Sequence, residues 1–347
     1  MRDGQGGTGA HESPRSREHA GVQMTRFGYF LSCEEYTPDE LLEQARLAEQ
    51  AGFDALWISD HFHPWTDAQG QAPFVWSMIG AISQVCDLPV TTAVTCPTVR
   101  THPAVIAQAA ATSAVLLGEG RFTLGVGTGE ALNEHVLGDR WPRTDVRLEM
   151  LEEAVAVIRR LWTGDVVSHE GKHYEVDTAR IYTLPDTPPP IYVSAFGPKA
   201  LEVATRIGDG FVTTKPDADS LRHFRAAKGA DAPAQTGFKV AWGPTRDEAI
   251  DVAFERWPNA GVPGELSQVL PSPQHFEQAA ELVTREAFAE NGAFGPDVAE
   301  HVKAYAPFVD AGFDEVYVAN MGPHYADMLA AYGSDVLPEL RSRSSQP

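Results

Sequence analysis

The sequence is poor in basic residues, in cysteine and in long apolar runs. Its 27 lysines and arginines face 48 acidic residues, which gives a formal net charge of −21. Because nucleic acids are bound through basic patches, this balance argues against a nucleic-acid partner. No run of about 18 apolar residues occurs, so no membrane partner is predicted. A small molecule is the expected binding partner.

Cysteine is scarce as well, with Cys33, Cys86 and Cys96 alone. Their spacing matches no metal motif, and their number is odd, so the sequence predicts neither a metal site nor a disulfide framework. Reduced thiols are typical of the cytoplasm, which is the expected location.

Residues 1–23 are rich in glycine, serine and charged side chains and lack an apolar stretch. They are therefore predicted to be a disordered tail and not a secretory signal. Met24 stands directly before the first apolar run and is a candidate alternative start. A single domain is expected over residues 24–347.

Apolar runs alternate with helical patterns along that domain. The candidate strands are residues 27–31, 55–58, 90–95, 122–126, 191–195, 210–213, 237–241 and 315–319. Candidate helices separate most of them, at residues 38–50, 103–117, 147–161, 199–207 and 298–311. Eight such units predict a (β/α)8 TIM barrel, with a doubly wound sheet as the alternative. Segments near residues 164–190 and 259–295 break the pattern and are predicted to be insertions.

Two segments carry the chemistry. The first, LGVGTGEALNE at residues 124–134, is an apolar strand followed by alternating glycines, an acid and the start of a helix. Alternating glycines let a backbone come close to a bound molecule. The second, ISDHFHPW at residues 58–65, places an acid, an imidazole and an indole after another strand. In a barrel, such side chains meet at the carboxyl ends of the strands.

These segments resemble the F420-dependent branch of the luciferase-like oxidoreductases, above all the group around the F420-dependent glucose-6-phosphate dehydrogenases. The resemblance spans about residues 25–340. It implies a luciferase-like TIM barrel, coenzyme F420 as cofactor, and a homodimer.

The resemblance implies four catalytic residues. His61 is the expected general base, since an imidazole titrates near neutrality and can take the hydroxyl proton of an alcohol. Glu34 would relay protons with His61, and Trp65 would hold the substrate. Glu130 would supply a proton to N1 of the deazaflavin.

The cofactor-binding residues follow from the same resemblance. Asp60 would face the ring, and Ala93-Val94 stands where the family has a non-proline cis peptide. The Ser194–Gly197 turn (Ser194, Ala195, Phe196 and Gly197) opens a helix whose amino end suits an anion, although Phe196 replaces a family glycine. The remaining expected contacts are Thr128, Gly129, Glu130 and Asn133.

The substrate is expected to differ from glucose 6-phosphate. Thr214, Trp65 and Glu34 are predicted to bind it. The family's phosphate-holding cations are missing: Asp217 stands at one position, residues 261–281 contain no lysine or arginine, and Glu290 begins the segment that replaces another. A phosphate dianion would bind weakly there, so a neutral alcohol or an amino-sugar alcohol is favoured.

Three alternatives remain open at this stage. The same residues would serve a reductase or an epimerase. An FMN-dependent luciferase-like monooxygenase would use the same barrel, but it has no need of a paired base and acid. A non-enzymatic cofactor carrier would not need the proton-transfer set.

Overall fold

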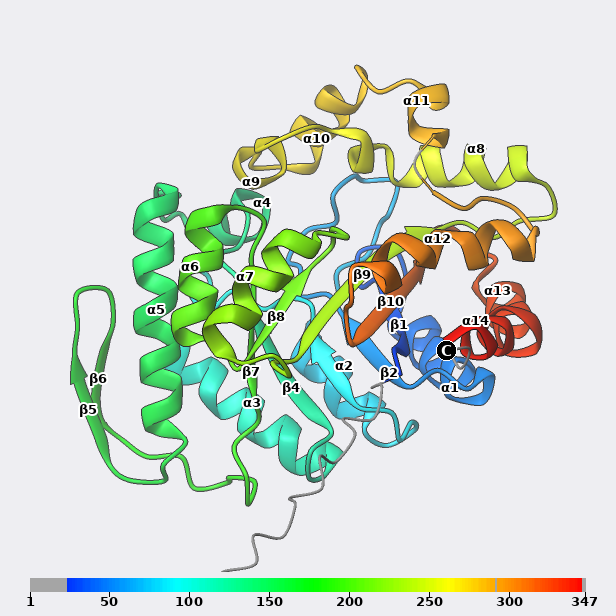
Figure 1. Ribbon diagram of the computed structural model, residues 1–347. Helices are drawn as coiled ribbons and strands as arrows, with labels where there is room; N and C mark the ends of the chain where they lie inside the picture. The colour runs from blue at the N-terminus through cyan, green and yellow to red at the C-terminus, as the bar shows by residue number, and fades with distance from the viewer. Residues whose placement is uncertain (1–23, 291, 345–347) are drawn as a thin grey trace, which may run out of the picture.

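The computed structural model describes residues 24–290 and 292–344, so the tail predicted at residues 1–23 lies outside the described part. Eight parallel strands form a closed barrel in the order β1-β10-β9-β8-β7-β4-β3-β2 (Figure 1). The strands are β1 Arg26–Leu31, β2 Ala55–Ile58, β3 Val90–Thr92, β4 Phe122–Val126, β7 Ile191–Ser194, β8 Gly210–Thr213, β9 Ala234–Val240 and β10 Glu315–Asn320. The predicted TIM barrel is confirmed.

Helices surround the barrel and cap one of its ends (Figure 1). They are α1 Pro38–Ala51, α2 Val75–Ile82, α3 Pro103–Leu117, α4 Ala131–Glu134, α5 Thr144–Leu161, α6 Pro198–Ile207, α7 Ala218–Lys228, α8 Arg246–Arg256, α9 Leu266–Val269, α10 Pro273–Ala280, α11 Arg285–Ala289, α12 Val298–Asp310, α13 Tyr325–Ala331 and α14 Leu337–Ser344. In the part of the chain that is described, none of these helices has the length and apolar character needed to cross a bilayer.

Local signals explain where helices begin and end. Thr37 caps α1, and its hydroxyl accepts a hydrogen bond from the Glu40 amide while Glu40 accepts one from the Thr37 amide. This reciprocal capping satisfies two amides that the helix leaves free. Gly52 ends the helix in a left-handed conformation, with φ of 84°, which glycine adopts without strain.

The barrel interior is filled by large side chains opposite small ones. The rings of Trp57 and Tyr317 stack with centroids 4.3 Å apart, and Trp57 Nε1 donates to Gln235 Oε1 at 2.8 Å. A Cβ atom at Gly28 would lie 2.2 Å from the Tyr317 ring, so only glycine fits there. A filled barrel leaves function to the strand ends.

Two strand boundaries differ from the sequence prediction by three residues, and the other strand boundaries differ by one residue at most. β9 begins at Ala234 and not at residue 237, because the polar Gln235 and Thr236 concealed a strand whose side chains are buried. β3 ends at Thr92, before the peptide bond between Ala93 and Val94, which is cis as the family resemblance implied.

The first insertion is a hairpin of β5 Val167–Glu170 and β6 Glu175–Ala179 on the outer side of α5 (Figure 1). Glu153 of α5 accepts hydrogen bonds from the amides of Lys172, His173 and Tyr174 in the hairpin turn. Lys172, His173 and Tyr174 therefore form the hairpin turn, and β6 begins after them at Glu175.

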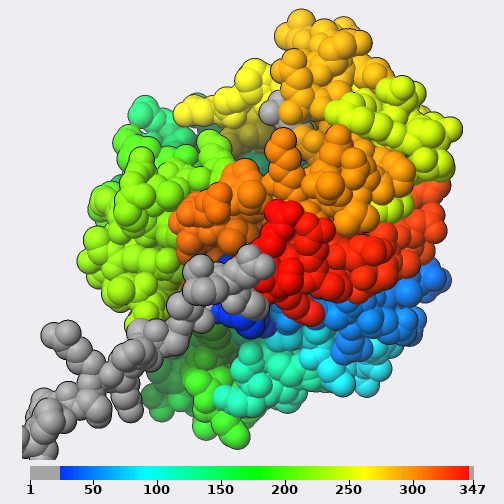
Figure 2. Space-filling view, turned by 45° about the vertical axis from the view of Figure 1, so that its right-hand side comes forward, coloured from blue at the N-terminus to red at the C-terminus, as the bar shows by residue number. Residues whose placement is uncertain are grey.

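The second insertion follows β9 and α8 and carries α9, α10 and α11. These helices gather over one end of the barrel (Figure 1) and form the yellow-to-orange rim at the top of Figure 2. Because the insertion leaves from the carboxyl end of β9, it lies on the side where function is expected.

Candidate active site

His61 and Glu34 form an ion-pair contact where β1 and β2 end. His61 Nε2 lies 3.3 Å from Glu34 Oε1, and the two side chains are 10% and 3% exposed. Ser59 donates its hydroxyl to Glu34 Oε2 at 2.8 Å and accepts from the amide of Cys33. The structure thus brings together two residues predicted to act as one proton-transfer unit.

The environment of Glu34 favours its charged form. Burial alone would raise the pKa of this carboxyl, but the nearby His61 and Lys239 charges and the Ser59 hydrogen bond hold that pKa below its usual range. Glu34 is therefore a buried carboxylate facing the imidazole.

Asn133 orients His61. Its Oδ1 accepts hydrogen bonds from the amides of Phe62 and His63 at 2.9 and 3.1 Å, so its Nδ2 faces His61 Nδ1 at 3.1 Å. The His63 carbonyl also lies 3.1 Å from His61 Nδ1 and can accept from the protonated ring. The Asn133 side chain therefore holds this loop, and its contact with the cofactor stays a prediction.

Trp65 connects the pair to the second insertion. Its ring lies 4.9 Å from the His61 ring, and its other neighbour is Phe276 of α10, 5.0 Å away at 82°. Asp67 donates its amide to Glu277 of the same helix at 2.9 Å. The insertion therefore packs on the loop that carries His61 and Trp65.

Asp60 belongs to a second buried cluster that sequence reasoning missed. Its carboxylate accepts hydrogen bonds from Thr95 at 2.9 Å and from Arg100 Nη2 at 2.8 Å. Arg100 also donates its backbone amide to Glu134. Burial would lower the pKa of Arg100, but Asp60 and Glu134 raise it above its ordinary value. The Asp60 carboxylate is thereby fixed beside the His61 loop.

The alternating glycines after β4 make room for the chain itself. A Cβ atom at Gly125 would lie 1.9 Å from the Thr92 carbonyl oxygen. Gly129 has φ of 73°, and its Cβ atom would lie 2.5 Å from Cys96 Sγ. At these two positions glycine accommodates the end of β3 and the loop after it, and the approach of a ligand to this backbone stays a prediction.

The remaining predicted residues lie where β4, β7 and β8 end. Glu130 is the N-cap residue of α4 and is half-buried, and among the described residues no side chain or amide hydrogen-bonds its carboxyl group. Thr128 and Ser194 are half-buried, and Ala195 is buried. Phe196, Gly197 and Thr214 are exposed.

Glu35, the residue that follows Glu34, is also buried. Its Oε1 accepts from Arg256 Nη1 at 3.0 Å and from the Gly322 amide at 2.8 Å, and its Oε2 accepts from Trp257 Nε1 at 2.5 Å. Burial raises the pKa of Glu35, and these hydrogen bonds partly offset that. This carboxylate ties the end of α8 to the loop after β1.

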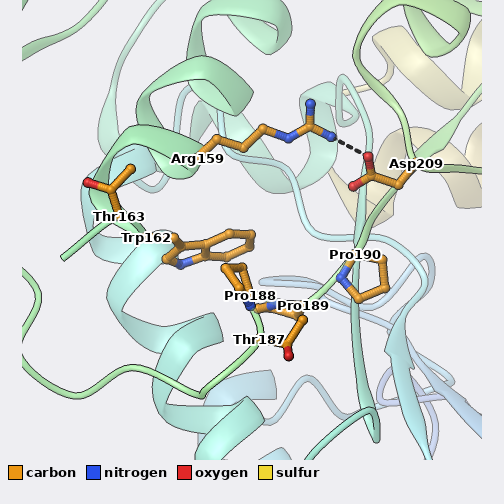
Figure 3. A pocket seen from close by; sticks show the side chains of 8 residues that line it. All are labelled: Arg159, Trp162, Thr163, Thr187, Pro188, Pro189, Pro190 and Asp209. Atoms are coloured by element: carbon orange, nitrogen blue, oxygen red, sulfur yellow. Dashed lines mark hydrogen bonds and ion pairs between the residues drawn. The ribbon is translucent and has the colours of Figure 1, made fainter.

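A separate cleft of about 570 Å3 lies at the other end of β7 (Figure 3). The Trp162 ring and the prolines 188–190 form its apolar walls, and an ion pair between Arg159 and Asp209 at 2.8 Å borders it. It holds none of the predicted site residues. Across residues 24–290 and 292–344, no three His, Cys, Asp or Glu side chains gather as a metal site would require.

Comparison with known proteins shows the family to which this barrel and its strand-end residues belong. Residues 24–315 match the family model described as luciferase-like monooxygenase. An F420-dependent glucose-6-phosphate dehydrogenase of Microbacterium testaceum (strain StLB037) is 36% identical over 331 residues, which cover 92% of this chain and 98% of that protein. Another, of Nakamurella multipartita, is 37% identical over 335 residues, with 92% and 98% covered.

A solved structure has a similar fold. It is an F420-dependent secondary alcohol dehydrogenase in complex with an F420–acetone adduct, 32% identical to this chain. The two superpose with a TM-score of 0.84 over 92% of this chain and 99% of the other.

Proposed function

This chain belongs to the luciferase-like family, within the group of the F420-dependent glucose-6-phosphate dehydrogenases, and we propose that it is an F420-dependent dehydrogenase acting on an alcohol. The observation that carries the proposal is the His61–Glu34 contact of 3.3 Å beside Trp65 at the carboxyl ends of the strands. Oxidation of an alcohol needs a proton acceptor at the reacting hydroxyl, and this pair offers one.

The loop before α6 fits the anionic tail of coenzyme F420. Gly197 caps the helix without a side-chain hydrogen bond, and a Cβ atom there would meet nothing within 4 Å. The first-turn amides are thus open to a phosphate group. Lys215 lies with its Nζ 6.0 Å from the Phe196 ring and adds positive charge beside this loop.

Coenzyme F420, when bound, supplies a deazaflavin whose C5 exchanges a hydride with the alcohol carbon. His61 takes the hydroxyl proton at its ring and shares it with Glu34 through Nε2 and Oε1. Trp65 limits water and orients the substrate against the His61 ring. Glu130, whose carboxyl group is not otherwise engaged among the described residues, would hold the proton for N1 of the ring when the cofactor is bound.

The same geometry supports a substrate other than glucose 6-phosphate. Arg285 of the second insertion forms ion pairs with Asp247 and Asp251 of α8, and its charge is therefore already neutralised. Asp217, which stands at one of the family's cation positions, caps α7 by accepting hydrogen bonds from the amides of Asp219 and Ser220. A neutral alcohol or an amino-sugar alcohol is thus favoured over a phosphate ester.

Turnover of F420 with a panel of alcohols tests this assignment. We expect bleaching of the deazaflavin absorbance with neutral secondary alcohols or amino-sugar alcohols, and at least tenfold lower kcat/KM with glucose 6-phosphate, since about 1.4 kcal/mol corresponds to a factor of ten. A kcat/KM highest for glucose 6-phosphate would contradict the substrate assignment and leave the cofactor assignment standing.

A further inference from the structure

Lys239 lies on β9 beside the catalytic pair and is absent from the predicted site. Its Nζ donates to the Ser32 hydroxyl at 3.3 Å. The ammonium sits over the ring of Trp257, 4.0 Å from its centroid, and 4.7 Å from that of Phe30. Ser32 is two residues before Glu34, so this cation stands at the end of β1 where the carboxylate is held.

The charges near Lys239 alternate in sign. Glu34 faces His61 on one side, and Glu35 faces Arg256 on the other. Within residues 24–290 and 292–344, Lys239 forms no direct ion pair. Its positive charge therefore acts on the Glu34 and Glu35 carboxylates at longer range. Glu35 already accepts hydrogen bonds from Arg256 and Trp257. The positive charge of Lys239 therefore matters more for the ionisation of Glu34.

We propose that Lys239 is a positioning residue for proton transfer, whose ammonium keeps Glu34 ionised as the partner of His61. The proposal rests on the proposed dehydrogenase function. A carboxylate that is only 3% exposed would otherwise tend to take a proton and lose its attraction for the imidazolium. When Lys239 is charged, Glu34 stays ionised and can accept the proton that His61 takes from the substrate.

The pKa directions agree with this geometry. Burial lowers the pKa of Lys239, and Glu34 and Glu35 act in the opposite direction. The charged or titratable groups facing Glu34 are His61 after β2, Lys239 on β9, and Cys33 on its own loop. Burial and Glu34 raise the pKa of the Cys33 thiol, which therefore stays neutral. Lys239 supplies a positive charge that takes no part in the reaction, whereas His61 changes charge in it.

The test is the titration of Glu34 in the cofactor-free protein. Carbon-13 NMR of labelled glutamate carboxyl groups reports it, and the Glu34 signal is assigned by its loss in Glu34→Gln. In Lys239→Met, which keeps the side-chain length under Trp257, we expect the titration midpoint of Glu34 to rise by about one pH unit. Lys239→Arg should restore it. Lys228→Met, an exposed lysine at the end of α7, is the matched control and should match the wild type.

Activity gives the second readout. The acid limb of the kcat/KM profile should move to higher pH in Lys239→Met, so that kcat/KM below the limb falls about tenfold for each pH unit by which the limb moves. Lys239→Gln serves if the methionine variant fails to fold. An unchanged Glu34 titration in folded Lys239→Met or Lys239→Gln would overturn the proposal. Because NMR needs neither cofactor nor substrate, failure of the dehydrogenase assignment would leave this result interpretable.

Discussion

His61 Nε2 lies 3.3 Å from Glu34 Oε1, and the two side chains come from loops that follow adjacent strands. Ser59 fixes the carboxylate and Asn133 fixes the imidazole. An imidazole held between an amide and a buried carboxylate is oriented before substrate arrives, which is the property a general base requires.

Replacing the imidazole should abolish chemistry without abolishing binding. In His61→Asn we expect kcat to fall about 10²- to 10⁴-fold, the range for loss of a general base. Cofactor affinity, measured by fluorescence titration, should stay within about threefold, because the general base acts on the substrate hydroxyl and not on cofactor binding. A variant that retains a tenth or more of the wild-type kcat would exclude His61 as the base.

Glu34→Gln should reveal whether the two residues act as a unit. The amide keeps the size of the side chain but removes the charge that attracts the imidazolium, so kcat should fall about 10- to 100-fold. In the double variant with His61→Asn, the loss should be close to that of His61→Asn alone, because coupled groups are not additive. Fully additive losses would show that the residues act independently.

Glu35 should matter for the stability of the second insertion. Glu35→Gln leaves Arg256 without its carboxylate partner; since the Arg256 side chain is 33% exposed, we expect the free energy of unfolding to fall by about 1–3 kcal/mol. Urea unfolding measures this, and proteolysis should become faster within α8 to α11. Glu290→Gln, an exposed acid in the same insertion, is the control. Equal stability of the two variants would contradict the anchoring role.

His301 should make the fold sensitive to acid. It is fully buried, with Nε2 donating to the Gly295 carbonyl and Nδ1 accepting from the Tyr332 hydroxyl, both at 2.9 Å. Burial lowers its pKa below 6.5. The unfolded chain therefore binds the proton more readily, and stability should fall as pH decreases below 6.5, by at most about 1.4 kcal/mol per pH unit.

Urea unfolding between about pH 7.5 and 5 measures this dependence. His301→Gln should flatten the curve relative to the wild type, whereas replacing the exposed His223 should leave its shape unchanged. A wild-type curve no steeper than that of His301→Gln would refute the assignment.

The barrel was predictable because alternating apolar runs and capped helices are local signals. Thr37 and Gly52 mark the two ends of α1 in the sequence as they do in the structure. The start of β9 was predicted three residues too late because Gln235 and Thr236 are polar. Gln235 is buried against Trp57, which lies far away in the sequence. Such pairings exist only once the barrel closes.

The site residues likewise divide into those that a local motif identifies and those whose partners are distant in the sequence. His61 and Trp65 lie in one continuous motif, so the sequence alone identifies both as candidate site residues. Arg100 and Lys239 are isolated basic residues with partners 40 and 207 positions away, and no spacing rule identifies them. The burial of Glu35 also has no local signal in the sequence, since its partner Arg256 lies 221 residues further along the chain.

The choice between coenzyme F420 and FMN is measured by fluorescence titration of the purified protein with each oxidised cofactor. We expect saturable F420 binding at least 100-fold tighter than FMN binding, a difference of about 2.7 kcal/mol. Tighter binding of FMN would contradict it, move the chain to the flavin-dependent branch of its family, and remove the roles given to His61 and Glu130.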